Sequence, residues 1–525
     1  MSDSTLLLII LCFPVCGAIL VAALPKGNGA LLSRICSMLL MLAVLSASLA
    51  VFFRCGAYDS NLPGVIVPWI PSLGVNFSLS VDELNIYPLM LTSLLFPVTL
   101  ACCWQRPETE SRLFLSMLLF LESTLLGTFL SQNLAVFFMF WEAVLVPIFV
   151  IILVFGGKKR SSAAFTFFIY TMAGSVLFLA AVIALGVESF KQTGSWSFEL
   201  TTLAGLSLDW NTQLFVFLAI TLACAIKCPL FPFHSWLPQA YCEAPFAASA
   251  IMAGVMSKMG VFGILKLAIP LCPDAAKLFG PSIMTAAAFS LVYGALIALR
   301  QTDYKKLVAY SSLSHMGYIV LGLFSFHEIA LHGAMLQILN HGVIVAGFFL
   351  VFGLLEQRLG SDYVKLTALS DRAPRLALIL MFFILSSLAL PLTSGFASEF
   401  LILFGSFQSA LATWQAGNGI TALISVLAAS TGVILGAAYM LRFARKILYG
   451  KAEAGVSFPD LGLRETMALA PLLAVILWIG LNPNSIIKIA ERATGAAVPS
   501  RQPVVHSQTT TSPLPANNHG GVNDR

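Results

Sequence analysis

The sequence predicts an all-α membrane protein that crosses a lipid bilayer about 14 times. Of its 525 residues, 58% are hydrophobic and only 10% are charged, and the mean hydropathy is +0.90. Soluble domains carry about 25% charged residues, so this composition indicates that lipid surrounds the chain. The apolar runs are continuous and do not alternate with period two, which favours spanning helices over a closed β-barrel.

The apolar runs divide the chain into separate predicted spans. Their limits are 5–24, 30–53, 84–104, 112–131, 134–155, 161–186, 213–233, 245–268, 280–299, 306–324, 328–355, 377–407, 419–447 and 463–489. The first run has no basic residue before it, which predicts a retained helix and not a cleaved signal peptide. The runs at 377–407 and 419–447 exceed one simple crossing, so we expect them to be tilted or broken. Residues 490–525 are rich in small polar residues and Pro, which predicts a disordered tail.

The basic residues predict the orientation. With the N-terminus outside, the inner loops hold 19 of the 29 Lys and Arg residues, whereas the outer loops hold 4. Cytoplasmic loops are enriched in Lys and Arg, so both termini are predicted on the outer, periplasmic or equivalent side. These residues lie in short loops and not on one face, which argues against a nucleic-acid partner.

The sequence carries no signature of a cofactor. The ten Cys residues are scattered and include no C-x-x-C pair or iron–sulfur spacing. Neither a dinucleotide-binding glycine motif nor a P-loop is present, and no His/Cys/carboxylate cluster has metal-ligand spacing. We therefore predict no redox centre, no cofactor, no metal and no catalytic residue in the usual sense.

Five ionisable residues fall inside the predicted spans, although a charge at mid-membrane costs about 2.5–3.5 kcal/mol on insertion scales. They are Glu122, Glu142, Lys227, Lys258 and Glu399. Such residues face a bundle interior, pair with one another or line a water path, which predicts an ion- or proton-moving protein. The alternative is structural ion pairs that only fix helix packing, and for Glu122 the two interpretations are equally open.

Two of these residues lie beside helix breakers. Lys227 is followed by Pro229 and Pro232, and Glu399 is preceded by Pro391 and Gly395. Proline removes a backbone donor, so spans seven and twelve are predicted to be broken and hydrated. Because they stand five spans apart, we expect two inverted five-helix repeats, as in transporters. The predicted organisation is 1–111, 112–268, 280–447 and 463–489, followed by the tail at 490–525.

Four histidines are further proton-relay candidates because imidazole titrates near neutral pH. They are His315, His341, His332 and His234. Each could instead provide a hydrogen bond that holds helices together. His332 and His341 are nine residues apart, which puts them on roughly opposite faces of one helix.

Long stretches of the chain resemble the antiporter-like subunits of respiratory complex I, roughly over residues 65–450. The stretches are Phe140-Trp141-Glu142 through Pro147, Gly156-Gly157-Lys158-Lys159-Arg160 with Phe168-Ile169-Tyr170-Thr171, Lys227 through Pro238, Ser257-Lys258-Met259-Gly260, and Asp303 through Ser312. Within this family, the carboxylate at Glu399 resembles the subunit M type, where sister subunits are expected to carry lysine. The chain departs from the family at Ala389-Leu390-Pro391-Leu392 and at Tyr241 through Phe246.

The resemblance implies a proton channel without electron chemistry of its own, driven by quinone reduction elsewhere in the complex. It implies that Glu142 and Lys227 form a charge pair, that Lys258 lies at the membrane centre and that Glu399 connects to the far side. The implied partners are the other membrane-arm subunits, of L and N type and smaller, together with lipid. The implied location is an energy-transducing membrane, bacterial inner or thylakoid. The alternatives are a subunit of a multi-subunit cation/proton antiporter or of a hydrogenase-linked membrane complex.

Overall fold

The computed structural model describes residues 3–25, 29–57, 64–360, 366–417, 419–450 and 458–497. Helices dominate this part of the chain, and thirteen helical segments are long and apolar enough to span a membrane. The shorter helix α3 (Ile86–Cys102) forms one further predicted span. The short helix α18 (Pro374–Ser387) lies in the same predicted span as α19 (Ser394–Gln415), which is already one of the thirteen. The prediction of an all-α, multi-pass membrane fold is confirmed.

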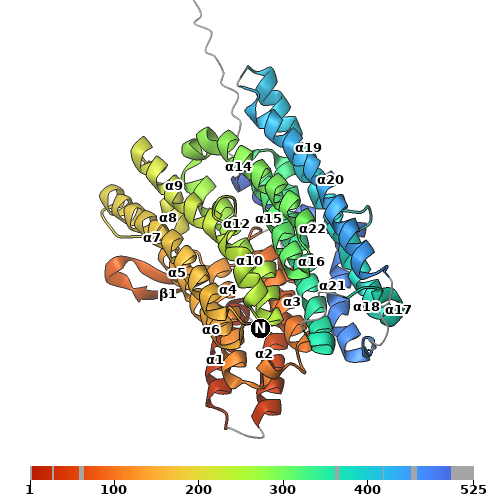
Figure 1. The fold of residues 1–525 in the computed structure, drawn as a ribbon. Helices are drawn as coiled ribbons and strands as arrows, with labels where there is room; N and C mark the ends of the chain where they lie inside the picture. The colour runs from red at the N-terminus through yellow and green to blue at the C-terminus, as the bar shows by residue number, and fades with distance from the viewer. Residues whose placement is uncertain are drawn as a thin grey trace, which may run out of the picture.

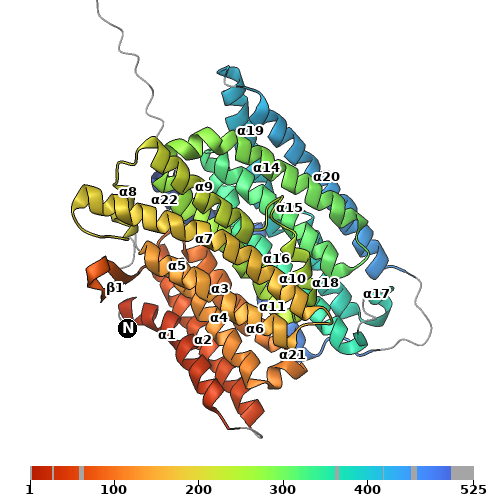
Figure 2. The same cartoon turned by 60° about the vertical axis from the view of Figure 1, so that its left-hand side comes forward.

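The first third of the chain supplies one edge of the molecule and the helices around it (Figures 1 and 2). Its helices are α1 (Asp3–Ala23), α2 (Gly29–Ala57), α4 (Arg112–Leu130), α5 (Leu134–Ala143), α6 (Leu145–Phe155) and α7 (Arg160–Thr193), with the 3₁₀ turns η1 (Pro71–Leu73) and η2 (Pro107–Glu110). The predicted span 134–155 is divided at Val144, between α5 and α6.

The middle of the chain forms the centre of the bundle. Its elements are α8 (Leu200–Ala204), α9 (Trp210–Lys227), α10 (Trp236–Glu243), α11 (Phe246–Ile251), η3 (Met252–Met256), α12 (Ser257–Gly263), η4 (Ile264–Ala268) and α13 (Ile269–Leu271). The elements η3 and η4 are π-helical turns inside one otherwise continuous span. Such turns are rare, occur frequently at functional sites and shift backbone bonds to a five-residue spacing.

The last part of the chain completes the bundle and reaches its opposite edge, where α19 and α20 lie (Figure 2). Its remaining helices are α14 (Pro273–Arg300), α15 (Tyr304–Phe324), α16 (Glu328–Leu359), α17 (Leu369–Arg372), α20 (Thr421–Ile447), α21 (Leu463–Leu481) and α22 (Asn484–Ala497). Helix α16 packs against α3, α11, α15, α18 and α19, which makes it the central element of this half.

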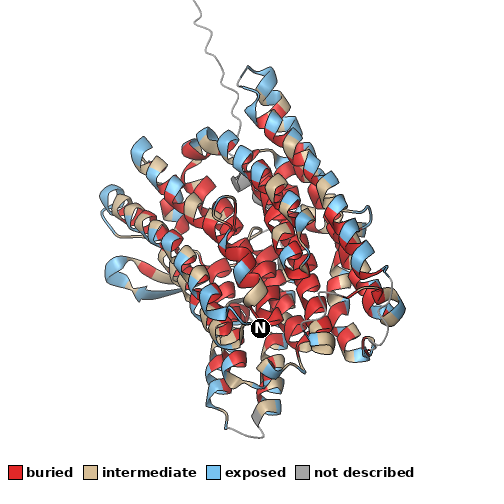
Figure 3. Ribbon diagram, viewed as in Figure 1, coloured by how far each residue is buried: buried red, intermediate tan, exposed pale blue. Residues whose placement is uncertain are grey.

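Burial separates the inner helices from the lipid-facing ones (Figure 3). In the span 246–271 and in α16, the most apolar stretch is 100% buried within the chain. In α20 it is only 28% buried, and exposed side chains such as Ile424 and Ile434 are apolar. The outer helices therefore present apolar side chains to the lipid. The polar side chains of the inner helices are buried behind them, away from the lipid.

Both predicted helix breaks are present. Helix α9 ends at Lys227 and α10 begins at Trp236, whereas α18 ends at Ser387 and α19 begins at Ser394. The two breaks share one backbone bond type, because Leu230 N–H donates to Ala225 O and Leu390 N–H donates to Leu385 O, each five residues back. This likeness supports the two inverted repeats at 112–268 and 280–447, which stay a prediction.

Two regions differ from the sequence-based expectation. Strands β1 (Val65–Ile70) and β2 (Val75–Leu79) form an antiparallel hairpin between the second and third spans. The predicted span 463–489 is divided at Pro483, and α22 continues to Ala497, so residues 490–497 are helical where a disordered tail was predicted. The rest of that tail lies outside the described residues.

Candidate functional site

Lys258 lies inside the bundle, on α12 shortly after the π-helical turn η3. Its side chain is completely buried, and its Nζ lies 2.7 Å from Ala253 O and 3.2 Å from Ser257 Oγ. The third neighbour is Nδ1 of His341, at 2.8 Å. A buried ammonium is costly unless it is hydrogen-bonded, and here a π-turn carbonyl, a hydroxyl and an imidazole share that role.

A close contact between two helices brings Lys258 to His341. Gly254 of η3 and Gly342 of α16 face each other so tightly that a Cβ atom built on Gly342 would lie 2.8 Å from Gly254 O. Gly254 is one turn before Lys258, and Gly342 directly follows His341. These glycines therefore set the distance between the lysine and the histidine.

His315 and Glu399 form a second buried pair, contributed by α15 and α19. His315 Nδ1 lies 3.1 Å from Glu399 Oε1, and both side chains are more than 90% buried. Gln337 Nε2 lies 3.4 Å from the same ring nitrogen and 3.5 Å from the same carboxylate oxygen. Ser398 Oγ donates to Gln337 Oε1 at 2.5 Å, which fixes the orientation of the amide. The break before α19 thus places Glu399 beside an interior polar group.

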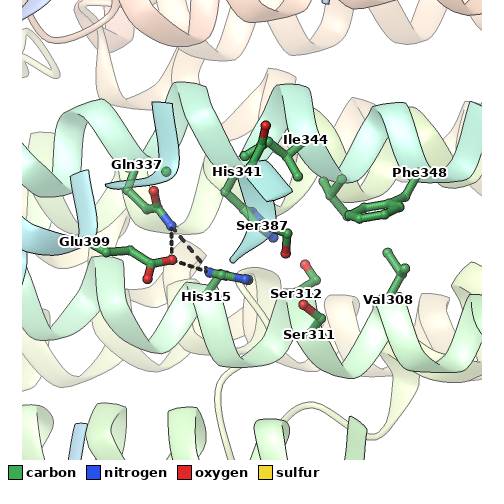
Figure 4. A pocket seen from close by; sticks show the side chains of 13 residues that line it. Val308, Ser311, Ser312, His315, Gln337, His341, Ile344, Phe348, Ser387 and Glu399 are labelled. Atoms are coloured by element: carbon green, nitrogen blue, oxygen red, sulfur yellow. Dashed lines mark hydrogen bonds and ion pairs between the residues drawn. The ribbon is translucent and has the colours of Figure 1, made fainter. Parts of the chain in front are cut away.

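The two pairs meet at one small cavity. It has a volume of about 10 Å³ and is lined by polar side chains from α15, α16, α18 and α19 and by the apolar Val308, Ile344, Val345 and Phe348 (Figure 4). The rings of His315 and His341 are 5.3 Å apart between centroids, and no hydrogen bond between them is recorded within the described residues. Lys258, His341, His315 and Glu399 therefore form one row of titratable groups across the middle of the bundle, with a single interruption.

Glu142 and Lys227 lie in adjacent regions without a direct ion pair between these two described residues. Lys227 is 1% exposed, and its Nζ lies 3.3 Å from Trp141 O and 4.9 Å from the centroid of the Trp141 indole. Trp141 Nε1 donates to Ser175 Oγ, which holds the ring. The ammonium of Lys227 is held here by a cation–π contact and a backbone carbonyl, and its charge pairing with Glu142 stays a prediction. Glu142 Oε1 is buried without a hydrogen-bond partner among the described residues.

His234 lies at a polar hollow of about 780 Å³, which we name the inner vestibule. Its walls are Lys159, Ser162, Ala163, His234, Ser235, Pro238, Gln239, Cys242, Glu243, Tyr293, Gln301, Lys306 and Tyr310. The His234 ring contacts Phe231 and Tyr293, at centroid distances of 5.6 and 5.2 Å. The vestibule therefore reaches the break between α9 and α10 from the loops that are predicted to face inward.

Glu122 and His332 are not part of the row. Glu122 on α4 is fully buried, and neither carboxylate oxygen has a hydrogen-bond partner in the part of the chain that the structure describes. His332 is buried on α16, nine residues before His341. Sequence reasoning did not single out Ser312, Ser387 or Ser398, because a buried serine in a helix resembles any packing residue.

Comparison with known proteins gives the family. Residues 131–427 match the family described as NADH:quinone oxidoreductase/Mrp antiporter, transmembrane. Subunit M of NADH-quinone oxidoreductase from Rhodobacter capsulatus is 36% identical over 495 residues, covering 92% of this chain and 94% of the relative. The chain belongs to this family of antiporter-like membrane subunits. The suspected resemblance to subunit M is confirmed.

Other subunit M relatives are similarly distant. The Escherichia coli K12 protein is 32% identical over 456 residues, covering 85% of this chain and 87% of the relative. A chain of respiratory complex I from Thermus thermophilus superposes with a TM-score of 0.81 at 30% identity, covering 94% of this chain and 99% of that one. The Mrp complex from Dietzia sp. matches with a TM-score of 0.78 at 22% identity, covering 93% of this chain and 52% of that one, which shows the shared fold.

Proposed function

We propose that this subunit translocates protons through the row Lys258, His341, His315 and Glu399, driven by quinone reduction in other subunits of NADH-quinone oxidoreductase. The observation that carries the proposal is the pair of short contacts, 2.8 Å from Lys258 Nζ to His341 Nδ1 and 3.1 Å from His315 Nδ1 to Glu399 Oε1. Proton transfer needs donor and acceptor within hydrogen-bond reach, and these distances meet that requirement.

The chemistry follows from burial. A lysine without water favours release of its proton, and a nearby acceptor provides a place for that proton to go. His341 is that acceptor for Lys258, and Glu399 is the acceptor beyond His315. The break before α19 leaves Glu399 beside freed backbone groups, where water from the outer side can reach it.

Proton uptake from the inner side is assigned to the half of the subunit that contains His234 and Lys227. The inner vestibule offers a polar route from the inner side to His234, and the break after Lys227 adjoins it. Glu142 modulates Lys227 through its charge, since their helices are neighbours at Trp141. Glu122 is assigned a weaker part, because neither of its carboxylate oxygens has a hydrogen-bond partner among the described residues. His332 is assigned a weaker part because it lies nine residues before His341 on α16.

The partners in this proposal are the other membrane-arm subunits, including antiporter-like L and N types, and the surrounding lipid. The location is a bacterial inner membrane or a thylakoid membrane, with both termini on the outer side according to the distribution of basic residues. Purification with native partners separates this function from a cation/proton antiporter, because co-purified iron–sulfur subunits identify the redox complex.

The test compares two variants of the row with an exposed lysine. Lys258→Ala and Glu399→Gln should each lower proton translocation by about tenfold or more, because each removes a group that can ionise. Glu399→Asp should retain part of the translocation. The control is Lys277→Ala on the exposed face of α14.

Proton uptake by sealed membrane vesicles is recorded during quinone reduction, and assembly is checked on a native gel. Unchanged uptake with Lys258→Ala and Glu399→Gln in an assembled complex would refute the proposed function.

A further inference from the structure

Another hollow lies where the end of α1 meets the starts of α2 and α4, apart from the row and from the inner vestibule. These three helices pack against one another (Figure 2). The hollow has a volume of about 500 Å³, within the range of pockets that hold small ligands. The connections at this end are predicted to face inward, which puts the hollow at the level of the inner lipid headgroups. We name it the inner-leaflet pocket, and its polar and α4 walls are Glu110, Ser111, Arg112, Leu113, Ser116 and Met117.

The start of α4 presents free hydrogen-bond donors to this pocket. Ser111 is extended before the helix, and its side chain does not cap it. The backbone bonds of the helix begin with Leu115 N–H, which donates to Ser111 O at 3.2 Å. The N–H groups of Arg112, Leu113 and Phe114 have no recorded partner within the described residues. Unpaired N–H groups and the positive end of the helix dipole attract phosphate.

A buried hydroxyl in the same wall is a second, independent feature. Ser116 is 3% exposed, and its Oγ has no hydrogen-bond partner in the part of the chain that the structure describes. It lines the pocket one helical turn after Arg112, on the same face of α4. Because buried hydroxyls are normally hydrogen-bonded, this one fits an acceptor that comes from outside the chain.

Opposite charges line the pocket without pairing. Arg112 Nη1 donates to Ala22 O at 3.4 Å, and no ion pair between Arg112 and Glu110 is recorded among the described residues. A guanidinium and a carboxylate that share a pocket but stay apart suit a zwitterion, because each can bind the group of opposite charge. A headgroup with a phosphate and no ammonium would leave Glu110 without a counter-charge.

The order of groups along α4 matches the order of groups in a phospholipid. Arg112 stands at the start of the helix, and Ser116 lies about 6 Å further along its axis. The apolar side chains Leu113 and Met117 complete this wall, and Leu113 is 44% exposed. A phosphate, an ester carbonyl and an acyl chain follow one another in the same sequence from the membrane surface inward.

We propose that the inner-leaflet pocket binds one phospholipid whose headgroup combines a phosphate with a primary ammonium, as in phosphatidylethanolamine. The phosphate accepts hydrogen bonds from Arg112 and the first N–H groups of α4. The ammonium donates to the carboxylate of Glu110, and an ester carbonyl accepts from Ser116 Oγ. This site is independent of the proposed proton path, so either can fail without the other.

The test measures lipid binding to the complete complex in detergent, after its lipids have been removed. Phosphatidylethanolamine, phosphatidylcholine and phosphatidylglycerol with the same acyl chains are added, and native mass spectrometry counts the lipids that stay on the released subunit. Phosphatidylethanolamine should bind about tenfold more tightly than the other two, because only its ammonium can donate to Glu110. Arg112→Gln and Glu110→Gln should each weaken that binding by about tenfold, and Glu110→Gln should remove the preference over phosphatidylglycerol.

The matched control is Arg442→Gln on α20, which should bind phosphatidylethanolamine normally. Its guanidinium also donates to a backbone carbonyl, Leu299 O at 2.8 Å, in an exposed position outside the pocket. Equal affinity for the three lipids, or unchanged binding in both Arg112→Gln and Glu110→Gln, would overturn the site.

A density map of the unmodified complex in phosphatidylethanolamine nanodiscs decides the question if a variant fails to assemble. It should show a headgroup between Arg112 and Glu110. An empty pocket, or a protein segment that fills it, would refute the lipid site.

Discussion

Substitution of Gly342 tests whether helix spacing controls proton transfer. A Cβ atom at this position would lie 2.8 Å from Gly254 O and 2.4 Å from a methyl group of Leu91. The leucine can rotate, but the backbone carbonyl must move by about 0.6 Å to reach an ordinary contact of 3.4 Å. A shift of that size extends the Lys258–His341 contact from 2.8 Å to about 3.4 Å, near the limit for a hydrogen bond.

Gly342→Ala is therefore expected to slow proton translocation while destabilising the subunit by about 1–3 kcal/mol, the usual cost of overpacking a core. The assay measures quinone reduction and proton uptake in the same vesicles, so that coupling is separated from assembly. Gly436→Ala on α20 is the matched control, because the nearest atom to a Cβ there is 4.0 Å away. An assembled Gly342→Ala complex that pumps normally would show that the spacing does not matter for the transfer.

Three further predictions concern the rest of the chain. Lys227→Ala and Glu142→Ala should each abolish coupled pumping while the complex assembles, and Lys227→Arg should rescue only partly because arginine does not release its proton; full pumping with Lys227→Ala would leave only a packing role. A reporter fused after Arg525 should read the outer side of the membrane, and an inner-side signal would reverse the predicted topology. Glu465→Gln should lower the free energy of unfolding of the subunit by about 3 kcal/mol and so lower the melting temperature of the solubilised complex. The reason is that the buried Arg358 guanidinium, which lies 2.6 Å from Glu465, loses its counter-charge. An unchanged melting temperature would contradict that estimate.

The sequence predicts the spans and the helix breaks well, because both depend on local composition. Apolar runs mark the helices, and Pro229, Pro232 and Pro391 mark the places where helices stop. The hairpin β1–β2 was missed because the predicted spans leave residues 54–83 as a connection. The sequence does contain signals of a hairpin, because β-branched residues flank the turn residues Pro71 and Gly74. In the structure Gly74 has a φ of +63°, a conformation that favours glycine.

The candidate residues could be found from the sequence, but their pairing could not. Lys258 and His341 are 83 positions apart, and His315 and Glu399 are 84 apart. The cost of burying a charge in a membrane marks each ionisable residue as a candidate from the sequence alone. Which candidates contact each other depends on how the helices pack, which the sequence does not show. The resemblance implies a Glu142–Lys227 charge pair, whereas the contact of the Lys227 ammonium with Trp141 was not part of the sequence-based reasoning.

The π-helical turns also constrain how the length of this span can change. Each residue of an α-helix advances the side-chain direction by about 100° and the axis by about 1.5 Å. A π-turn holds one residue more than an α-turn, so removing one residue from Met252–Met256 would let the turn close as ordinary α-helix and leave the direction of Lys258 nearly unchanged. Removing one residue from the α-helical stretch Phe246–Ile251 would instead turn Lys258 by about 100°, away from His341. The span 246–271 is therefore expected to tolerate the loss of a residue inside a π-turn far better than the loss of a residue outside it.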